Sequence, residues 1–433
     1  MIKAGYARLD VTPPLGTDIS GYFHRRLAKG ILDPLYLIAV AVNNGEKTAV
    51  IMAIDYIGIS RDDNLEIRRL ISERTGVEED AIFISALHQH TSPCVANYKE
   101  KFTAMRDDVF KEVLFRKFAD AAQIAIDDMK EAEISVAECE TSEPIAFVRR
   151  YFTDDGEVVT NPRDTEHIVK RCADADNTVR LVRFTRRDSY DIALINFSTH
   201  PDVIGGEYFS ADWPGFTRRF VEEDIPNTRA IFLTGTQGDS NHIDFFKPRK
   251  DRLKGTGYEH SEYMGRTVAN AVISIWNSEK LIKGQQIFTK HKVIYNKTNQ
   301  DGAEKYDEYK AWYDDYSAGK LKPTPHITEL AYASRVIKLR TSPIFRPVPL
   351  SVVGIGDLLF VGFGGEAFTF YGDVARKLFP ERHVICAVCT NGYEGYFPTA
   401  SAFSEGGYEA SSSLFSPSLE DEIVAGIKEM VEE

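Results

Sequence analysis

The sequence predicts an α/β fold, with a mixed, largely parallel sheet built from repeated strand–helix–strand units and helices on its outer faces. Three such units follow one another along the chain. Their apolar runs are almost continuous, which is typical of strands that are covered on both faces. With 433 residues, 43% of them hydrophobic and 27% charged, the chain can bury a large core as an ordinary globular protein does.

The first unit is preceded by a hairpin. An Asn-Gly pair at 44–45 separates two apolar runs, and this dipeptide is a strong signal for a tight turn between strands. The second run, 48–55, leads to an amphipathic helix expected over 61–76, which ends at Gly76 as a C-cap. A further strand is expected at 81–88.

The same order of elements recurs twice without repeating the same residues. Strand–helix–strand connections of this length are right-handed crossovers between parallel strands. The second unit is expected at 191–200, 212–224 and 229–239, and the third at 357–366, 368–379 and 383–396.

Polar side chains follow these predicted strands where each strand ends. In open α/β sheets, ligands bind in the crevice beyond the carboxyl ends of the strands. Six ends that carry residue types able to bind metals or transfer protons therefore predict one common site. These residues are Asp55, His88 with His90, His200, Asp239, Glu366 and the turn 391–396.

His88 and His90 stand two positions apart, so their side chains share a face if the strand continues. Such a pair alone is no better than an even indication of a metal site. His200 is expected to face the same crevice, although a core histidine capping a strand carbonyl is the alternative. Glu366 follows two glycines that allow a tight turn, and its charge also suits the start of the next helix. Two histidines and a glutamate together satisfy the ligand requirement of a catalytic zinc site.

Charge and composition exclude some partners. The formal net charge of −13 and the lack of a marked basic cluster argue against binding to nucleic acid. No apolar run reaches the length of a membrane span, and the first residues lack the apolar core of a signal peptide. The sequence therefore predicts no integral membrane segment and a cytoplasmic location.

The five cysteines are scattered along the chain, which fits a reducing compartment. Cys386 and Cys389 form a CxxC pair inside an apolar run. We expect them to be buried as small hydrophobic residues on opposite faces of a strand, and not to form a zinc knuckle or a redox pair.

Residues 296–330 differ in character from the rest of the chain and predict an aromatic helical insert. Four tyrosines and a tryptophan recur there at helical spacing. The favoured interpretation is a helix that packs its aromatic stripe on the body or on a partner subunit, and the alternative is a platform that stacks a substrate. The residues are Tyr306, Tyr309, Trp312, Tyr313 and Tyr316.

Seven motifs, in order, give the chain a resemblance to a known family. They are "AGYARLDVTPPLG", "ALHQHTSP", "FSTHP", "FSADWPGF", "GDSNHID", "IGDLLFVGFGGEAFT" and "GYEGYFPT" followed by "GGY". The chain resembles the neutral/alkaline (non-lysosomal) ceramidases, which are zinc amidohydrolases, along nearly its whole length. The resemblance implies a single catalytic domain over residues 1–433, without the C-terminal β-sandwich domain of longer members.

The resemblance also implies roles for individual residues. The zinc ligands fall on His88, His200, Glu366 and Tyr396, while His90 lines the site without binding the metal. Tyr408 matches a second active-site tyrosine, and Arg149 matches an active-site arginine, with Arg150 as the alternative.

The motif "GDSNHID" departs from the family pattern. The family's serine falls on Asn241, or on Ser240 if the turn is shifted by one position, so both are candidate substrate-binding residues. Asp239 is a candidate for orienting a ligand or hydroxyl, and a cap on the turn is the alternative. A serine nucleophile is not expected here, whereas hydrolysis by metal-activated water needs no serine.

The function implied by the resemblance is that of a zinc-dependent amidase, an N-acylsphingosine amidohydrolase of sphingolipid metabolism. One alternative is a metal-dependent hydrolase of a soluble acylated sugar or N-acyl compound. Another is a metal-stabilised binding protein without turnover. In each case the partner is a small molecule, either a lipid or an acylated polar compound, and assembly into a homo-oligomer stays open.

Overall fold

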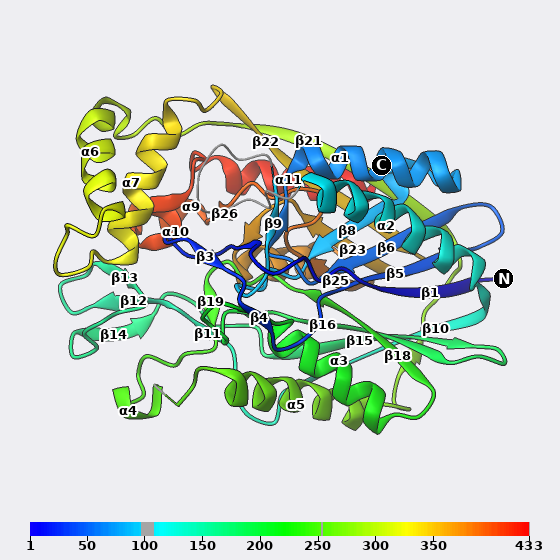
Figure 1. Cartoon of the computed structure of the whole chain (residues 1–433). Helices are drawn as coiled ribbons and strands as arrows, with labels where there is room; N and C mark the ends of the chain where they lie inside the picture. Colours follow the sequence, from blue (N-terminus) through cyan, green and yellow to red (C-terminus); the bar gives the residue numbers. More distant parts are fainter. Residues whose placement is uncertain (97–107, 253, 433) are drawn as a thin grey trace.

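The computed structural model describes residues 1–96, 108–252 and 254–432 (Figure 1). Each predicted unit is present, and each opens with an antiparallel hairpin, so that the repeated element is ββαβ. The first unit comprises β5 (Tyr36–Asn43), β6 (Thr48–Ile54), α1 (Arg61–Thr75) and β8 (Ile82–Ala86). The second comprises β15 (Thr178–Arg186), β16 (Asp191–Phe197), α3 (Asp212–Asp224) and β18 (Thr228–Thr234). The third comprises β22 (Phe345–Ile355), β23 (Leu358–Phe363), α8 (Thr369–Leu378) and β25 (His383–Ala387).

The predicted α/β class with a mixed sheet is confirmed. The last two strands of each unit pair in parallel, β6 with β8, β16 with β18 and β23 with β25. The parallel share is smaller than expected, because the first two strands of every unit are joined by a short turn and must pair antiparallel. A pattern of apolar runs cannot distinguish these hairpin strands from parallel ones.

The first two units share one large sheet. Its strand order is β18-β16-β15-β10-β1-β5-β6-β8, in which β1 (Lys3–Asp10) and β10 (Lys130–Glu140) join the units by antiparallel pairing. The third unit pairs with β21 (Ile287–Lys297) in a separate four-stranded sheet.

Both faces of the central strands are buried, as the continuous apolar runs predict. Along β5, Ile38 and Val40 point into one core, while Ala39 and Ala41 point into the other. Helices α1, α2 (Asp108–Asp127) and α11 (Leu419–Glu432) lie on one side of the sheets, and α3 and α5 (Tyr258–Ile275) lie on the other (Figure 1).

The carboxyl ends of the three units meet at one place. The Thr234 hydroxyl, at the end of β18, donates to the carbonyl of Leu87 just beyond β8 at 2.9 Å. The Thr234 carbonyl accepts a hydrogen bond from the backbone of Val388 just beyond β25 at 3.1 Å. The common edge expected from the strand ends is therefore real, although it is formed by two sheets.

Two helices form the aromatic insert at one end of the molecule, beside α10 (Tyr408–Ser412) (Figure 1). The Tyr309 ring of α6 (Tyr306–Ser317) packs edge-on against the Tyr332 ring of α7 (Ile327–Leu339), with centroids 5.1 Å apart. This contact lies between the two helices of the insert, whereas the favoured interpretation placed the aromatic stripe on the body or on a partner subunit.

Cys386 and Cys389 are both buried free thiols, as predicted, but they belong to the same core instead of lying on opposite faces of a strand. Because β25 ends at Ala387, strand alternation does not set the direction of Cys389, whose sulfur lies 3.7 Å from Nδ1 of His88. Among the described residues, no helix is long and apolar enough to cross a membrane.

Candidate metal centre and catalytic cavity

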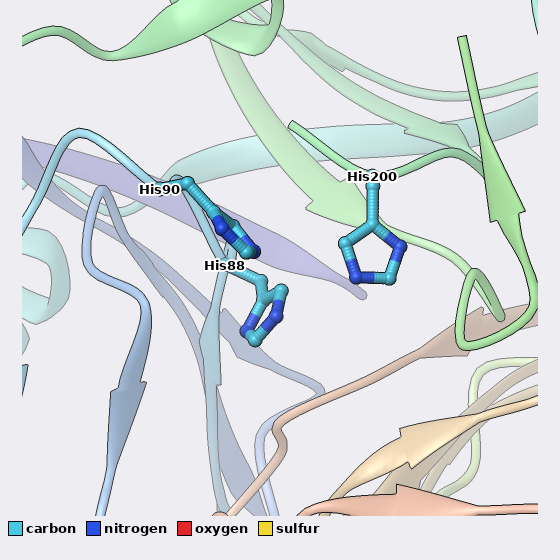
Figure 2. A group of neighbouring side chains, drawn as sticks. All are labelled: His88, His90 and His200. Carbon is cyan, nitrogen blue, oxygen red and sulfur yellow. The ribbon is translucent and has the colours of Figure 1, made fainter. Parts of the chain in front are cut away.

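Three buried histidines converge where the unit ends meet. One ring nitrogen of each of His88, His90 and His200 lies within 4.8 Å of the others (Figure 2). His88 and His90 follow β8, and His200 reaches the same point from beyond β16. Sequence positions more than 100 residues apart thus supply one cluster of donors.

The backbone of His88 is the reason that this cluster forms. The strand β8 ends at Ala86, so the predicted alternation along a continuing strand does not apply. Instead, His88 has a φ of 73°, in the left-handed region that non-glycine residues adopt at a cost. This turn brings the His88 and His90 rings to 5.2 Å, nearly perpendicular to one another.

Backbone carbonyls orient the rings of His88 and His200. The Nδ1 atom of His88 lies 2.7 Å from the Ile57 carbonyl, and Nδ1 of His200 lies 2.9 Å from the carbonyls of Gln237 and Ser240. A carbonyl can only accept, so this network assigns the proton to Nδ1 in both rings. Each Nε2 is therefore directed into the site, where the neutral form of the ring can bind a metal ion.

Glu366 meets both of these nitrogens. Its Oε2 lies 3.2 Å from Nε2 of His88 and 3.1 Å from Nε2 of His200. The residue begins β24 (Glu366–Ala367), which pairs in parallel with β26 (Tyr396–Phe397). Burial acts to raise the pKa of Glu366, but the adjacent His88 and His200, whose Nε2 atoms face the carboxylate, hold it well below its usual value. Glu366 is therefore an ionised carboxylate at the base of the site.

His90 differs from the other two histidines. Neither of its ring nitrogens makes a hydrogen bond of normal geometry, although the residue is only 8% exposed. Nδ1 lies 3.5 Å from Oδ1 of Asp202, a carboxylate that also accepts a hydrogen bond from the Tyr22 hydroxyl at 2.6 Å. Burial and the neighbouring His88 and His200 hold the pKa of His90 well below its usual value, so the ring is neutral.

The donor set fits a transition metal ion. Neutral imidazoles and a carboxylate are zinc ligands, and the two oriented Nε2 atoms already point at one carboxylate oxygen. The unpartnered nitrogens of buried His90 are polar atoms that a metal or a substrate would satisfy. Both His88/His200/Glu366 and His88/His90/His200 are geometrically able to hold an ion.

Arg149 and two tyrosines form the wall beside the histidines. Arg149 Nη2 donates to the Tyr396 hydroxyl and to the Gly238 carbonyl, both at 3.0 Å. Its Nε donates to Glu409 at 2.7 Å, an ion pair buried on both sides. The Tyr408 ring lies 5.5 Å from that of Tyr396. Burial raises the pKa of both tyrosines above the usual value, while the charge of Arg149 acts in the opposite direction on each.

A cavity of about 220 Å³ opens onto this wall. Glu366, Tyr396 and Tyr408 line its inner end, and the far wall comes from the α6–α7 insert. The insert residues that contribute are Tyr313, Ala331, Ser334, Arg335 and Lys338.

The sequence matches no family model and no curated protein. Solved structures do match. A neutral ceramidase from Pseudomonas aeruginosa superposes with a TM-score of 0.74 at 14% identity, over 99% of this chain and 74% of that chain. The chain has the neutral ceramidase fold. A structure of ceramidase complexed with C2 gives a TM-score of 0.75 at 14% identity over the same shares. At this identity the likeness concerns the fold, and it confirms the resemblance to ceramidases seen in the motifs.

Within the ceramidase fold, the "GDSNHID" residues have structural contacts. The Asp239 carboxylate accepts hydrogen bonds from the backbone and hydroxyl of Thr369 at 2.9 Å, at the start of α8, and not from its own turn as the alternative had it. The Ser240 hydroxyl has only long contacts of 3.4 and 3.5 Å to carbonyls. Asn241 donates to Asn161 at 2.9 Å. None of these three side chains lines the cavity.

Arg150, the alternative to Arg149, points elsewhere and bonds Glu405 and the carbonyl of Gly406. Tyr393, whose hydroxyl donates to Oε1 of Glu366 at 3.0 Å, was expected only as part of the turn 391–396, and Asp202 and Glu409 were not expected. All three stand within three positions of predicted site residues, and this proximity is the signal that could have indicated them.

Proposed function

We propose that the chain is a metal-dependent hydrolase of ceramidase type that cleaves an amide bond. The observation that carries this proposal is the convergence of His88, His200 and Glu366 at the tyrosine-lined cavity of a ceramidase fold. We assign zinc to these three residues, with the Tyr396 oxygen as the fourth ligand. Arg149 donates a hydrogen bond to that oxygen and thereby favours negative charge on it.

Zinc at such a site supplies a Lewis acid that polarises a carbonyl group and makes hydroxide available near neutral pH. The chain's own residues supply the hydrogen-bond donors and the proton transfer. We assign Arg149, held by Glu409, and the neighbouring Tyr408 phenol as the donors to an oxyanion derived from the amide carbonyl. Neutral His90, with Nδ1 facing Asp202, keeps Nε2 to accept a proton and pass it to the leaving amine.

The first candidate substrate is an N-acylsphingosine, because ceramide is what the matching proteins are named for. A second candidate is a soluble N-acyl compound or acylated sugar. The size of the cavity favours the second, since about 220 Å³ is below the ~300–1,000 Å³ of pockets that hold drug-sized ligands. Its far wall also carries the polar and cationic side chains Ser334, Arg335 and Lys338.

Metal analysis and substrate assays on one set of variants test the proposal. Purified protein is expected to contain about one equivalent of zinc per chain, and His88→Ala is expected to lose it together with at least about 100-fold of the activity. His383→Ala, an exposed histidine at the start of β25, serves as the matched control and retains both. A protein without any transition metal, in which His88→Ala is as active as wild type, overturns the proposal.

The choice of substrate is made by parallel assays of a short-chain ceramide, N-acyl amino acids and N-acetyl sugars. Lys338→Glu is expected to reduce turnover of anionic N-acyl compounds more than that of ceramide if the second candidate is correct. Stoichiometric metal without turnover of any of these substrates supports a metal-stabilised binding protein instead.

A further inference from the structure

A second pocket lies apart from the catalytic cavity and shares none of its lining residues. It has a volume of about 180 Å³ and lies beside β19 (Ser240–Asn241). Its polar lining includes His242, Lys247, Arg252, Lys254, His260 and Tyr263.

Two buried groups of this pocket lack hydrogen bonds of normal geometry. His242 is 8% exposed, and its ring nitrogens make none, although a contact with the backbone of Gly255 acts to raise its pKa. The buried Nε of Arg252 has no acceptor either. Buried polar atoms in native proteins are almost always hydrogen-bonded, so an unsatisfied cluster indicates a missing water or ligand. The volume is enough for about six water molecules at ~30 Å³ each, and therefore for a small polyatomic ion.

The charges around the pocket favour an anion. Residues 247–254, "KPRKDRLK", carry five cations and one acid in a chain whose net charge is −13. Two of the acidic residues at the pocket are already engaged, since Asp244 accepts from Arg171 at 2.5 Å and Glu143 bonds to Tyr263. The third, Asp251, is exposed on α4 (Arg249–Arg252). Lys247, Lys254 and Arg252 thus remain to face a ligand.

We propose that this pocket binds a phosphate-type oxyanion, either free or as a phosphomonoester group. Arg252 Nε and one ring nitrogen of His242 donate to its oxygens, and Lys247 and Lys254 balance its charge. Burial and the neighbouring His260 and His200 lower the pKa of His242 to about 3, so its ring is neutral and its second nitrogen is an acceptor. Hydrogenphosphate carries the P–OH donor that this nitrogen needs, and so does the monoanion of a phosphomonoester, below its second pKa of about 6, whereas sulfate carries none.

Calorimetric titration of the full chain with inorganic phosphate tests the site. Wild type is expected to bind one phosphate per chain and to bind sulfate at least about tenfold more weakly. His242→Phe keeps a planar ring without nitrogens and is expected to weaken phosphate binding by at least about tenfold. Lys250→Ala, which removes a cation of the same segment outside the pocket lining, is the matched control and binds like wild type.

Circular dichroism shows whether His242→Phe is folded. If it is not, Lys254→Glu replaces it as the test variant and is expected to weaken phosphate binding by the same factor. Flotation with phosphatidic acid vesicles, against pure phosphatidylcholine vesicles, distinguishes a lipid headgroup from a free phosphate as the source. No saturable phosphate binding by folded wild type, or equal binding by His242→Phe and by Lys250→Ala, overturns the proposal. Hydrolase activity enters none of these measurements, so the outcome is independent of the catalytic proposal.

Discussion

At the scale of single residues, the site is defined by what each ring nitrogen faces. In His88 and His200, Nδ1 donates to backbone carbonyls and Nε2 faces Glu366. In His90, neither ring nitrogen bonds to the backbone, and the ring lies near Asp202. Three histidines that look alike in the sequence therefore lie in two different hydrogen-bonding environments, and Tyr393 contacts the carboxylate that faces two of them.

Tyr393→Phe tests this supporting role. The substitution removes the hydrogen bond to Oε1 of Glu366 and keeps the ring that packs on His88. Loss of such an outer hydrogen bond typically lowers metal affinity by about 10–100-fold. Competition with a chelator measures the zinc dissociation constant, and Tyr295→Phe, at an exposed tyrosine of β21, is the control. Equal affinities of Tyr393→Phe and wild type would contradict the role given to Tyr393.

His291 makes stability depend on pH. Burial, and then Arg68 and Arg61, lower its pKa to about 4 in the folded chain, against about 6.5 when unfolded. Between these values the unfolded chain binds more protons, so the free energy of unfolding falls as the pH is lowered from 6.5 to 4. His291→Gln is expected to reduce this slope by up to about 1.4 kcal/mol per pH unit in urea titrations.

The exposed His167 provides the control of opposite sign for that measurement. A hydrogen bond to Asp154 raises its pKa, so His167 adds stability at low pH that is lost as the pH rises. His167→Gln is therefore not expected to flatten the slope. A slope that is unchanged in His291→Gln would show that His291 does not titrate in this window.

At the scale of elements, the ββαβ unit occurs three times, and the strand ends of each unit place side chains at the site. In the first unit, Ser60 accepts from the backbone of Asp63 to start α1, and Gly76 ends the helix in the left-handed conformation. These two positions set where the helix begins after β6 and where it ends before β8. The crossover then delivers His88 and His90 beyond the edge of the sheet.

Gly76→Ala measures how much the helix end contributes. Its φ is 74°, and an added Cβ would meet nothing within 4 Å, so the whole cost is that of the backbone conformation. We expect a loss of about 1 kcal/mol in the free energy of unfolding. Gly76→Asn should lose less, because asparagine tolerates the left-handed region. Equal stabilities of Gly76→Ala and wild type would show that the end of α1 refolds in another way.

At the scale of the whole molecule, buried contacts between units hold the site together. Thr234 links the ends of all three units through Leu87 and Val388. Asp55 at the end of β6 forms a two-point ion pair with Arg218 of α3, at 2.8 and 2.6 Å, and accepts from Gln89 between the two histidines. The candidate metal centre thus depends on the correct docking of the first unit against the second.

Asp55→Asn is expected to destabilise the fold by about 3–5 kcal/mol, because it leaves the buried Arg218 guanidinium without a counter-charge. Urea unfolding measures the loss. Arg69→Ala breaks the exposed pair with Glu73 on α1 and should change stability by no more than about 0.5 kcal/mol. Similar losses in the two variants would contradict the importance of docking through Asp55.

Local patterns determined much of this protein by themselves. The three crossovers, the end of α1 at Gly76 and the polar strand ends follow from hydrophobic period and turn chemistry, which act over a few residues. For that reason His88, His200 and Glu366 could be named as partners before any distance was known. The ceramidase motifs added Arg149, Tyr396 and Tyr408, which lie together in the structure.

Only the tertiary structure decided the direction of each side chain. The left-handed turn at His88, the carbonyls that fix the two tautomers and the contact of Tyr393 with Glu366 all depend on backbone far away in the chain. Asp239, a strand-end acid like the others, turned to cap α8 instead of lining the cavity. Periodicity places a residue at the end of a strand, but which way its atoms point is set by long-range hydrogen bonds that no local pattern encodes.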